Sequence, residues 1–188
     1  MASPRFDLSD GTLPGLKLIQ RWVLEDHRGS FSRLFCSEVF REAGFPHPVS
    51  QINHTHTRRQ GTIRGLHFQH PPHAEIKVVT CLRGEVYDVA VDLRKDSPTF
   101  LSWQGVVLSE TNHTSLVIPQ GFAHGFQALT DDCELVYLHS ESHHPEAEGG
   151  IHPEEPRLNI SWPRRIGEIS ERDQAWAFLP AHFPGISL

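Results

Sequence analysis

The stretch AEIKVVTCLRGEVYDVAVDL, residues 74–93, decides the fold class. Its two halves, Ala74–Leu82 and Glu85–Leu93, are rich in β-branched residues and have the length of strands. The Arg83-Gly84 pair between them predicts a β-hairpin. In the second half, from Val86 onward, apolar or aromatic residues at the odd-numbered positions 87–93 alternate with even-numbered positions that include two aspartates. A period of two residues is typical of a strand with two different faces.

Further strand-like runs follow this stretch, separated by turn signals. They are Phe100–Leu108, Ser115–Ile118, Phe126–Leu129 and Glu134–His139. Helical signals are confined to two short segments: Ser37–Ala43, with Ser37 as N-cap and Gly44 as its stop, and Ser170–Trp176, with Ser170 as N-cap. The sequence therefore predicts one mostly β domain over residues 1–188, a sandwich or a barrel.

The composition is that of a globular domain. The 188 residues are 38% hydrophobic and 21% charged, with a net charge of -6, which excludes a disordered chain. No basic run with interleaved aromatics predicts a nucleic-acid surface, and no stretch approaches the ~20 apolar residues of a membrane span. Cys36, Cys81 and Cys133 lie far apart, and no signal peptide is visible, so we expect reduced thiols in a cytoplasmic protein.

Histidine is unusually frequent, with 14 residues, against three lysines and two tyrosines. Such an excess points to a metal site or to acid–base chemistry. The motifs G-x-G-x-x-G, G-x-x-x-x-G-K-[ST], H-E-x-x-H and G-x-S-x-G are absent from the sequence. Dinucleotide-bound hydride transfer, nucleotide-driven phosphoryl transfer, zincin proteolysis and serine-esterase chemistry therefore lack their usual motifs.

A metal site is available as one interpretation of the histidines. In a strand, His54 and His56 would share a face, and His67 or His124 could be a third ligand. Cupin-type barrels use a similar H-x-H, followed by an acid and a distant P-x-G-x-x-H segment. The segment PQGFAH ending at His124 fits the last part, but Gln60 stands where the acid is expected. The alternative is that His54 and His56 face solvent.

Two scarce residues lie inside apolar runs. Lys77 shares a predicted strand face with Val79 and Cys81, which favours an inward-facing ammonium group that needs an anionic partner. A cation in that position can stabilise an enolate or a carboxylate. Tyr137 lies in the apolar run LVYL and is either a pocket residue or a core tyrosine with its hydroxyl at the rim.

Eight motifs span nearly the whole chain in one order: Asp26–Gly29, Gln51–Asn53, Arg64–Gln69, Gly84–Arg94, Ser97–Phe100, Ile118–Phe126, Ile160–Pro163 and Ile169–Asp173. In content, order and spacing they closely resemble the dTDP-4-dehydrorhamnose 3,5-epimerase family of sugar-nucleotide epimerases. The resemblance implies a jelly-roll, cupin-like β fold with a short helical segment near residues 164–188. It also implies a protein without metal or cofactor, and a homodimer that exchanges N-terminal strands.

The family's substrate is a nucleotide-linked 4-keto-6-deoxy sugar, and the resemblance implies a role for each of four catalytic residues. His67 would remove the proton α to the ketone, and Asp173 would hold its tautomer. Lys77 would stabilise the enolate oxygen. Tyr137 would return a proton from the opposite face, which inverts the stereocentre.

The resemblance also implies substrate-binding residues. Arg64 and Arg28 match positions that bind the diphosphate, with Arg28 reaching across from the other subunit. Gln51, Asn53 and His124 match positions that line the pocket.

Two departures from the family pattern bear on specificity. The segment Ser142-His143-His144 stands where members often have tyrosines that border the sugar, which makes His143 a candidate substrate contact. Arg33 stands where many members have a Glu at the edge that binds the base, which reverses the local charge.

The leading hypothesis is an epimerase that inverts C3, C5 or both in a nucleotide-linked 4-keto-6-deoxy sugar. The best candidate reaction converts dTDP-4-dehydro-6-deoxy-D-glucose to dTDP-4-dehydro-L-rhamnose. An enzyme that inverts C3 alone or C5 alone, a metal-dependent cupin enzyme that uses His54, His56 and His124, and a sugar-nucleotide binder without turnover are the alternatives.

Overall fold

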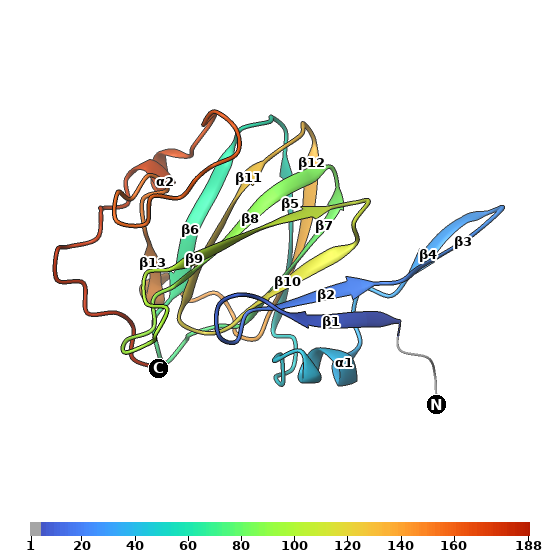
Figure 1. Cartoon of the computed structure of the whole chain (residues 1–188), viewed down its shortest axis with the longest axis horizontal. Coiled ribbons are helices and arrows are strands. Elements are labelled where there is room, and N and C mark those ends of the chain that lie inside the picture. Colours follow the sequence, from blue (N-terminus) through green and yellow to red (C-terminus); the bar gives the residue numbers. More distant parts are fainter. Residues whose placement is uncertain (1–4) are drawn as a thin grey trace.

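Two antiparallel β-sheets pack face to face in the computed structural model, which describes residues 5–188 (Figure 1). In sheet order, the six-stranded sheet contains β1 (Phe6–Asp10), β2 (Lys17–Arg21), β10 (Thr114–Ile118), β7 (Lys77–Arg83), β12 (Cys133–His139) and β5 (Gln51–Thr57). The five-stranded sheet contains β13 (Glu148–Gly150), β6 (Ile63–Gln69), β11 (Phe122–Ala128), β8 (Glu85–Asp92) and β9 (Trp103–Ser109). The predicted mostly β, cupin-like fold is confirmed.

The predicted hairpin at Arg83-Gly84 is wrong. Strand β7 pairs with β10 and β12 in one sheet, whereas β8 pairs with β9 and β11 in the other. A single residue, Gly84, separates the two strands, which is shorter than the two-residue loop that a tight hairpin needs. Gly84 has a φ of +73°, and a Cβ there would lie 2.6 Å from the Thr130 hydroxyl oxygen. The chain therefore crosses from one layer to the next at this glycine.

The alternation predicted for residues 85–93 determines how the layers pack. Val86 and Ala90 face the core between the two sheets. Val89 and Val91 face the other way, into a second apolar cluster that the C-terminal segment covers with residues such as Leu158. Because all four of these β8 side chains are buried, the strand fixes the C-terminal segment against the outer face of its sheet.

Several boundaries differ from the predictions. Helix α1 (Ser37–Glu42) has Cys36 as its N-cap, because the Cys36 carbonyl accepts the first helical N–H, and it ends before Gly44, which has a φ of +91°. Helix α2 (Glu171–Gln174) is shorter than expected, but Ser170 is its N-cap as predicted. Strand β9 begins at Trp103, because the residues before it form a turn with a φ of +61° at Leu101.

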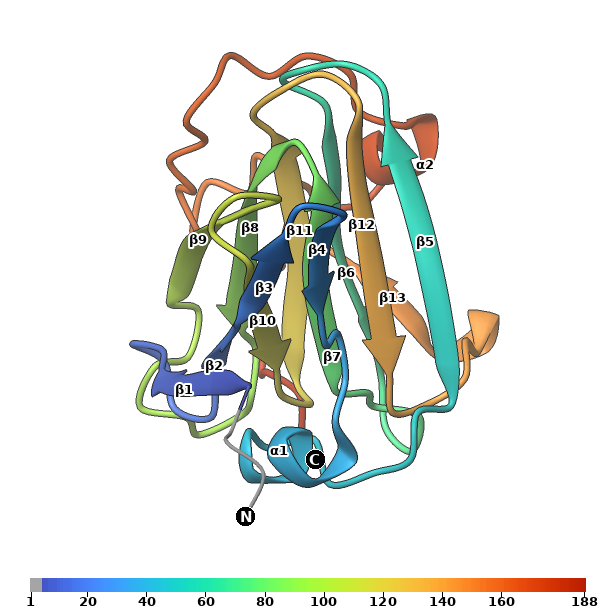
Figure 2. The same ribbon diagram turned by 90° about the vertical axis from the view of Figure 1, so that its right-hand side faces the viewer.

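The family resemblance implied N-terminal strands, but the sequence pattern did not give their positions. Strands β3 (Val23–Asp26) and β4 (Gly29–Ser32) form a separate hairpin that projects beyond the sandwich in Figure 1 and stands in front of it in Figure 2. Its large apolar side chains are exposed, Leu24 by 50% and Phe31 by 59%. A short 3-10 helix, η1 (Pro145–Ala147), precedes β13. Within residues 5–188, no helix has the length and apolar character needed to cross a bilayer.

Candidate active site

A cavity of about 780 Å³ opens between the two sheets. The six-stranded sheet lines it with Asn53, Thr55, Lys77, Tyr137 and His139. The five-stranded sheet contributes Ile63, Arg64, His67, His124 and Phe126, and residues 168–173 close one side. Groups from opposite sheets can thus reach opposite faces of one ligand.

The imidazole of His67 pairs with a buried carboxylate. His67 Nε2 lies 2.7 Å from Asp173 Oδ1, and the other carboxylate oxygen accepts the Gly65 backbone N–H at 3.1 Å. Burial acts to raise the pKa of Asp173, but the hydrogen bond and charge of His67, together with the Gly65 N–H, hold it below its usual value. The Arg172 guanidinium lies 3.2 Å from the same Nε2, but the shorter contact with a charged Asp173 places the His67 proton on Nε2. Nδ1 then keeps a lone pair and can accept a proton.

The C-terminal segment places this carboxylate. The Ser170 hydroxyl caps α2 by accepting the Asp173 backbone N–H at 3.1 Å, and Ile169 forms a bridge to Ile63 beside the cavity. In the same helix, Arg172 reaches both Asp173, at 3.5 Å, and Glu148, at 3.3 Å. The Arg172–Glu148 pair links the helix to β13, and the contacts of Asp173 with Gly65 and His67 hold it against β6.

A second histidine–carboxylate pair lies deeper in the cavity. His124 Nε2 is 3.0 Å from both oxygens of Asp88, and the Asp88 side chain is fully buried. The pair joins the adjacent strands β11 and β8, where the period-two pattern of β8 points Asp88 toward the interior. His124 is thereby held with its ring 6.1 Å from that of Tyr137, edge to face.

The opposite wall carries a cation and a phenol. Lys77 pairs with Glu75 at 3.0 Å, and both side chains are almost completely buried. Glu75 also lies 2.6 Å from His139 Nδ1. Burial raises the pKa of the Tyr137 phenol far above its usual value, so this hydroxyl keeps its proton and can donate it. The prediction that Lys77 faces inward toward an anion is confirmed.

The cavity rim presents an arginine that can bind an anion. Arg64 donates to the Thr57 hydroxyl at 3.0 Å and to the His56 carbonyl at 3.3 Å. Within residues 5–188 it forms no ion pair, so its guanidinium charge is not neutralised by a carboxylate. An exposed, uncompensated guanidinium at the mouth of a cavity suits a phosphate group.

The histidines considered as metal ligands do not come together. His54 and His56 alternate along β5 with the cavity residues Asn53 and Thr55, so they lie on the outer face of the strand. There they pair with Glu134, at 3.3 Å, and Asp132, at 3.0 Å. His124 points into the cavity on the other sheet. The solvent-facing interpretation of His54 and His56 is therefore the one that fits.

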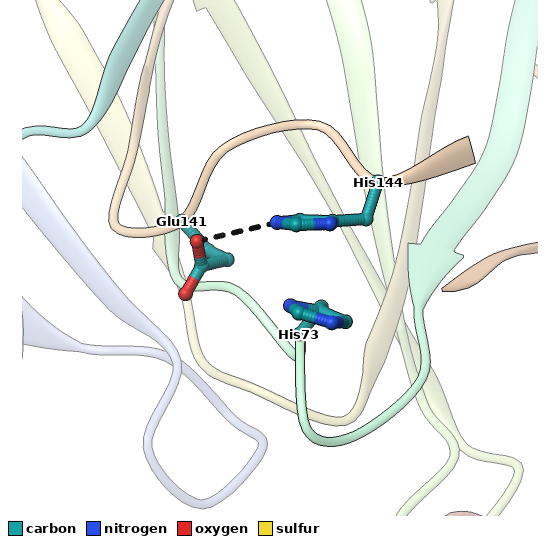
Figure 3. A group of neighbouring side chains, drawn as sticks. All are labelled: His73, Glu141 and His144. Atoms are coloured by element: carbon teal, nitrogen blue, oxygen red, sulfur yellow. Dashed lines mark ion pairs between the residues drawn. The ribbon is translucent and has the colours of Figure 1, made fainter. Parts of the chain in front are cut away.

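Another group of possible metal ligands, His73, Glu141 and His144, lies on two neighbouring loops (Figure 3). The two imidazoles are stacked, with ring centroids 3.6 Å apart and planes at 17°. A metal bound to nitrogen lies close to the plane of the ring, and one ion cannot lie in two nearly parallel planes. The stacking of His73 on His144 links the two loops, whereas the ion pairs of His144 with Glu141 and Glu146 lie within one loop.

Comparison with known proteins agrees with these features. The family described as dTDP-4-dehydrorhamnose 3,5-epimerase matches residues 10–180. An epimerase of that name from Methanothermobacter thermautotrophicus is 42% identical over 168 residues, which are 88% of this chain and 90% of the relative. The chain belongs to the dTDP-4-dehydrorhamnose 3,5-epimerase family. It is therefore related throughout to sugar-nucleotide isomerases.

Two further members show the range of the family. The Legionella pneumophila epimerase, solved in complex with dTDP-4-keto-L-rhamnose, is 35% identical, with a TM-score of 0.88, and the match covers 96% of this chain and 98% of that one. A dTDP-4-dehydrorhamnose 3-epimerase from Streptomyces niveus is 41% identical over 150 residues, 79% of this chain and 72% of the relative. Members that invert one carbon and members that invert two are thus about equally similar to this chain.

The cavity brings together most of the residues that the family resemblance singled out. His67, Asp173, Tyr137, Lys77, Asn53, Arg64 and His124 all line it. Gln51 and His143 line a smaller adjoining cavity of about 160 Å³ that shares Asn53, His67 and Lys77 with the first. Arg28 lies in the projecting β3–β4 hairpin and pairs with Asp26, and Arg33 follows β4 with an exposed side chain. Neither arginine lines the cavity of its own chain.

Three charged residues of the site were not predicted. Glu75 is two residues from Lys77, and Asp88 occupies an inward position of the alternating β8 pattern. For both residues, the period of two in a strand therefore indicated a side chain that faces inward. Arg172 precedes Asp173, but no periodicity in the sequence indicated its role. Its contact with Glu148 joins two segments that are 24 residues apart.

Proposed function

We propose that this chain is a cofactor-free epimerase that inverts C3 and C5 of a nucleotide-linked 4-keto-6-deoxy sugar, dTDP-4-dehydro-6-deoxy-D-glucose being the best candidate. Family membership supports the reaction class and the substrate. The geometry that supports it best is the placement of a histidine base on one sheet and a phenolic acid on the other, across a single cavity.

The reaction begins at the C–H bond next to the C4 ketone. Nδ1 of His67 takes the proton, the electron pair of that bond forms a carbon–carbon double bond, and the ketone oxygen becomes the enolate oxygen. The ammonium group of Lys77 stabilises that oxygen. Asp173 stabilises the imidazolium that has formed.

Inversion follows when a proton reaches the same carbon from the other face. The Tyr137 hydroxyl donates it, the ketone re-forms, and the phenolate is left within reach of the positive charge of Arg64. His67 and Tyr137 then return to their starting states by exchanging protons with water. No oxidation state changes, so the reaction needs no hydride carrier.

A hydrogen-exchange experiment tests this function. Enzyme and dTDP-4-dehydro-6-deoxy-D-glucose are incubated in D2O, and C3 and C5 are followed by NMR. Deuterium at both carbons, with inverted configuration, is the expected result. Absence of deuterium at either carbon, with this substrate and with other 4-keto sugar nucleotides, would overturn the proposal.

Inversion at C3 alone is the second candidate. Two observations favour it: the 3-epimerase relative at 41% identity, and the histidine pair at positions 143 and 144 in place of tyrosines that border the sugar. Deuterium that accumulates at C3 while C5 stays protonated would assign the chain to this class.

The active enzyme is proposed to be a homodimer in which each cavity is completed by the partner's β3–β4 hairpin. The exposure of Leu24 and Phe31, the unpaired edge of β5 with Ile52 63% exposed, and the position of Arg28 outside its own cavity support this. Burial of such a surface against a second copy would remove apolar area from water.

Subunit mixing tests this assembly. His67→Ala and Arg28→Ala are each expected to abolish turnover. When the two variants are mixed and re-equilibrated, half of the dimers are mixed, and each has one cavity with both wild-type residues, so about a quarter of wild-type activity returns. A mixture that stays inactive, or a monomer by light scattering, would contradict the proposal.

We also propose that the enzyme is located in the cytoplasm. Cys36, Cys81 and Cys133 are all free thiols, and two of them are buried in the core, which suits a reducing compartment.

A further inference from the structure

A chain of hydrogen bonds leads from the cavity rim toward the buried cation. The His143 backbone N–H donates to Gln51 Oε1 at 3.1 Å, and Gln51 Nε2 donates to Asn53 Oδ1 at 3.0 Å. Asn53 Nδ2 then lies 3.3 Å from His139 Nε2. Four residues from two strands and a loop are thus joined in sequence.

The chain continues into the protein through a shared carboxylate. His139 Nδ1 lies 2.6 Å from one oxygen of Glu75, and the ammonium group of Lys77 lies 3.0 Å from the other. The side chains of Glu75, Lys77 and His139 are 9%, 11% and 11% exposed. Both oxygens of the carboxylate are therefore occupied by basic groups, away from bulk water.

One fixed donor sets the direction of every bond in this chain. A backbone N–H can only donate, so Gln51 must present its amide oxygen to His143 and its NH2 group to Asn53. Because the Asn53 amide oxygen accepts from Gln51, Asn53 presents its own NH2 group to His139. His139 Nε2 therefore accepts, its proton lies on Nδ1, and it donates that proton to Glu75. Glu75 then accepts from His139 with one carboxylate oxygen and faces the Lys77 ammonium group with the other.

This arrangement restricts the ammonium group that the proposed mechanism needs. A lysine side chain has several rotatable bonds, so an untethered one samples many positions. Glu75 occupies one N–H of Lys77 and leaves two for a ligand oxygen. His139 in turn prevents the carboxylate from rotating away. Electrostatic stabilisation of an enolate depends on a donor that is in place before charge develops.

We propose that Glu75 and His139 are positioning residues that hold the Lys77 ammonium group toward the enolate oxygen, acting through Lys77 and not by touching the substrate. The inference rests on the proposed epimerase function. It assigns Gln51 and Asn53 a part in orienting His139, in addition to lining the cavity.

Substitution of the carboxylate by its amide is the direct test. Glu75→Gln keeps the shape but removes the charge that anchors Lys77. We expect kcat for deuterium incorporation to fall about ten- to a hundredfold while KM changes less than about threefold, because the enolate charge exists only as the reaction proceeds. Glu75→Asp, which retains the charge, should recover part of the loss. Glu134→Gln, on β12 but outside the cavity, is the matched control and should leave both constants unchanged.

A double-mutant cycle separates positioning from a general structural effect. In a Lys77→Met background, Glu75→Gln should cause no further loss, because its effect passes through the ammonium group. Lys77→Met alone leaves the buried Glu75 charge without its lysine partner and can be unstable, whereas the double variant holds no unpaired buried charge. Circular dichroism checks that the double variant is folded. Its kcat then keeps the cycle interpretable.

Three results would overturn the inference: an unchanged kcat in Glu75→Gln, a loss confined to KM, or an equal further loss in the Lys77→Met background. Failure of the proposed function itself is distinguishable, because then the wild-type protein would incorporate no deuterium at all.

Discussion

Replacing Asp173 by Asn tests the tautomer argument most directly. The carboxylate accepts from two donors at once: His67 Nε2–H at 2.7 Å and the Gly65 backbone N–H at 3.1 Å. An amide has only one oxygen. If that oxygen serves Gly65, the NH2 group faces His67 and forces a lone pair onto Nε2. The proton then lies on Nδ1, and the imidazole cannot act as a base there.

The other orientation of the introduced amide is costly. With its oxygen toward His67, the NH2 group faces the Gly65 N–H and leaves a buried donor without an acceptor, which costs about 1–3 kcal/mol. The competent orientation is then populated about 5- to 150-fold less than the other. Loss of the charge that stabilises the imidazolium removes about a further 1 kcal/mol. We therefore expect kcat to fall about 30- to 800-fold with little change in KM.

Two measurements check this prediction. Deuterium incorporation from D2O gives kcat and KM, and ¹⁵N NMR of histidine-labelled protein reports which nitrogen of His67 carries the proton. The spectrum should show protonated Nε2 in the wild type and protonated Nδ1 in Asp173→Asn. A loss of kcat smaller than about tenfold, or an unchanged tautomer, would refute the reasoning.

Three shorter predictions follow from the same structure. Tyr137→Phe should still exchange hydrogen for deuterium through His67 but with retained configuration; NMR that shows inversion at an undiminished rate would exclude the phenol as the acid. Gly65→Ala should lower the free energy of unfolding by about 1–3 kcal/mol in urea titration, because its Cβ would lie 2.5 Å from the Gly125 Cα. Asp92→Asn should lose about 2 kcal/mol at pH 7 and much less at pH 2. Burial acts to raise the pKa of Asp92, but its guanidinium and hydroxyl partners lower it to about 2. Its stabilising contribution is therefore complete above the unfolded value of 3.8 and declines as pH falls toward 2; a pH-independent difference would contradict this.

Strand content was predictable because it depends on local pattern. The period of two in β8 and the apolar run around Lys77 gave both the strands and the inward direction of the lysine. The partner of each strand was not predictable in this way. Residues 77–92 look like one hairpin in sequence, yet a single glycine sends their two halves into different sheets. Which layer a strand joins depends on contacts with β10–β12, which follow later in the chain.

The His67–Asp173 pair illustrates a different limit. His67 and Asp173 are 106 residues apart, and no periodicity connects them; their pairing was expected from the family resemblance alone. Glu75 and His139 are likewise 64 residues apart. The resemblance pointed to neither of them, although Glu75 lies beside a lysine that it did single out. Family motifs identify the groups expected to touch substrate, whereas the groups that orient them emerge from the packed structure.

Burial of the partner carboxylate accounts for the different roles of the many histidines. His67, His124 and His139 each pair with an acid that is at least nine-tenths buried, and all three line the cavity. His54 and His56 also pair with acids, but those acids are 33% and 53% exposed and lie outside it. A buried carboxylate is tolerated only with a hydrogen-bonded partner, so it fixes the orientation and tautomer of the imidazole it meets. An exposed acid is screened by water and imposes little on its partner. The number of histidines therefore says less about this site than the burial of the acids that they face.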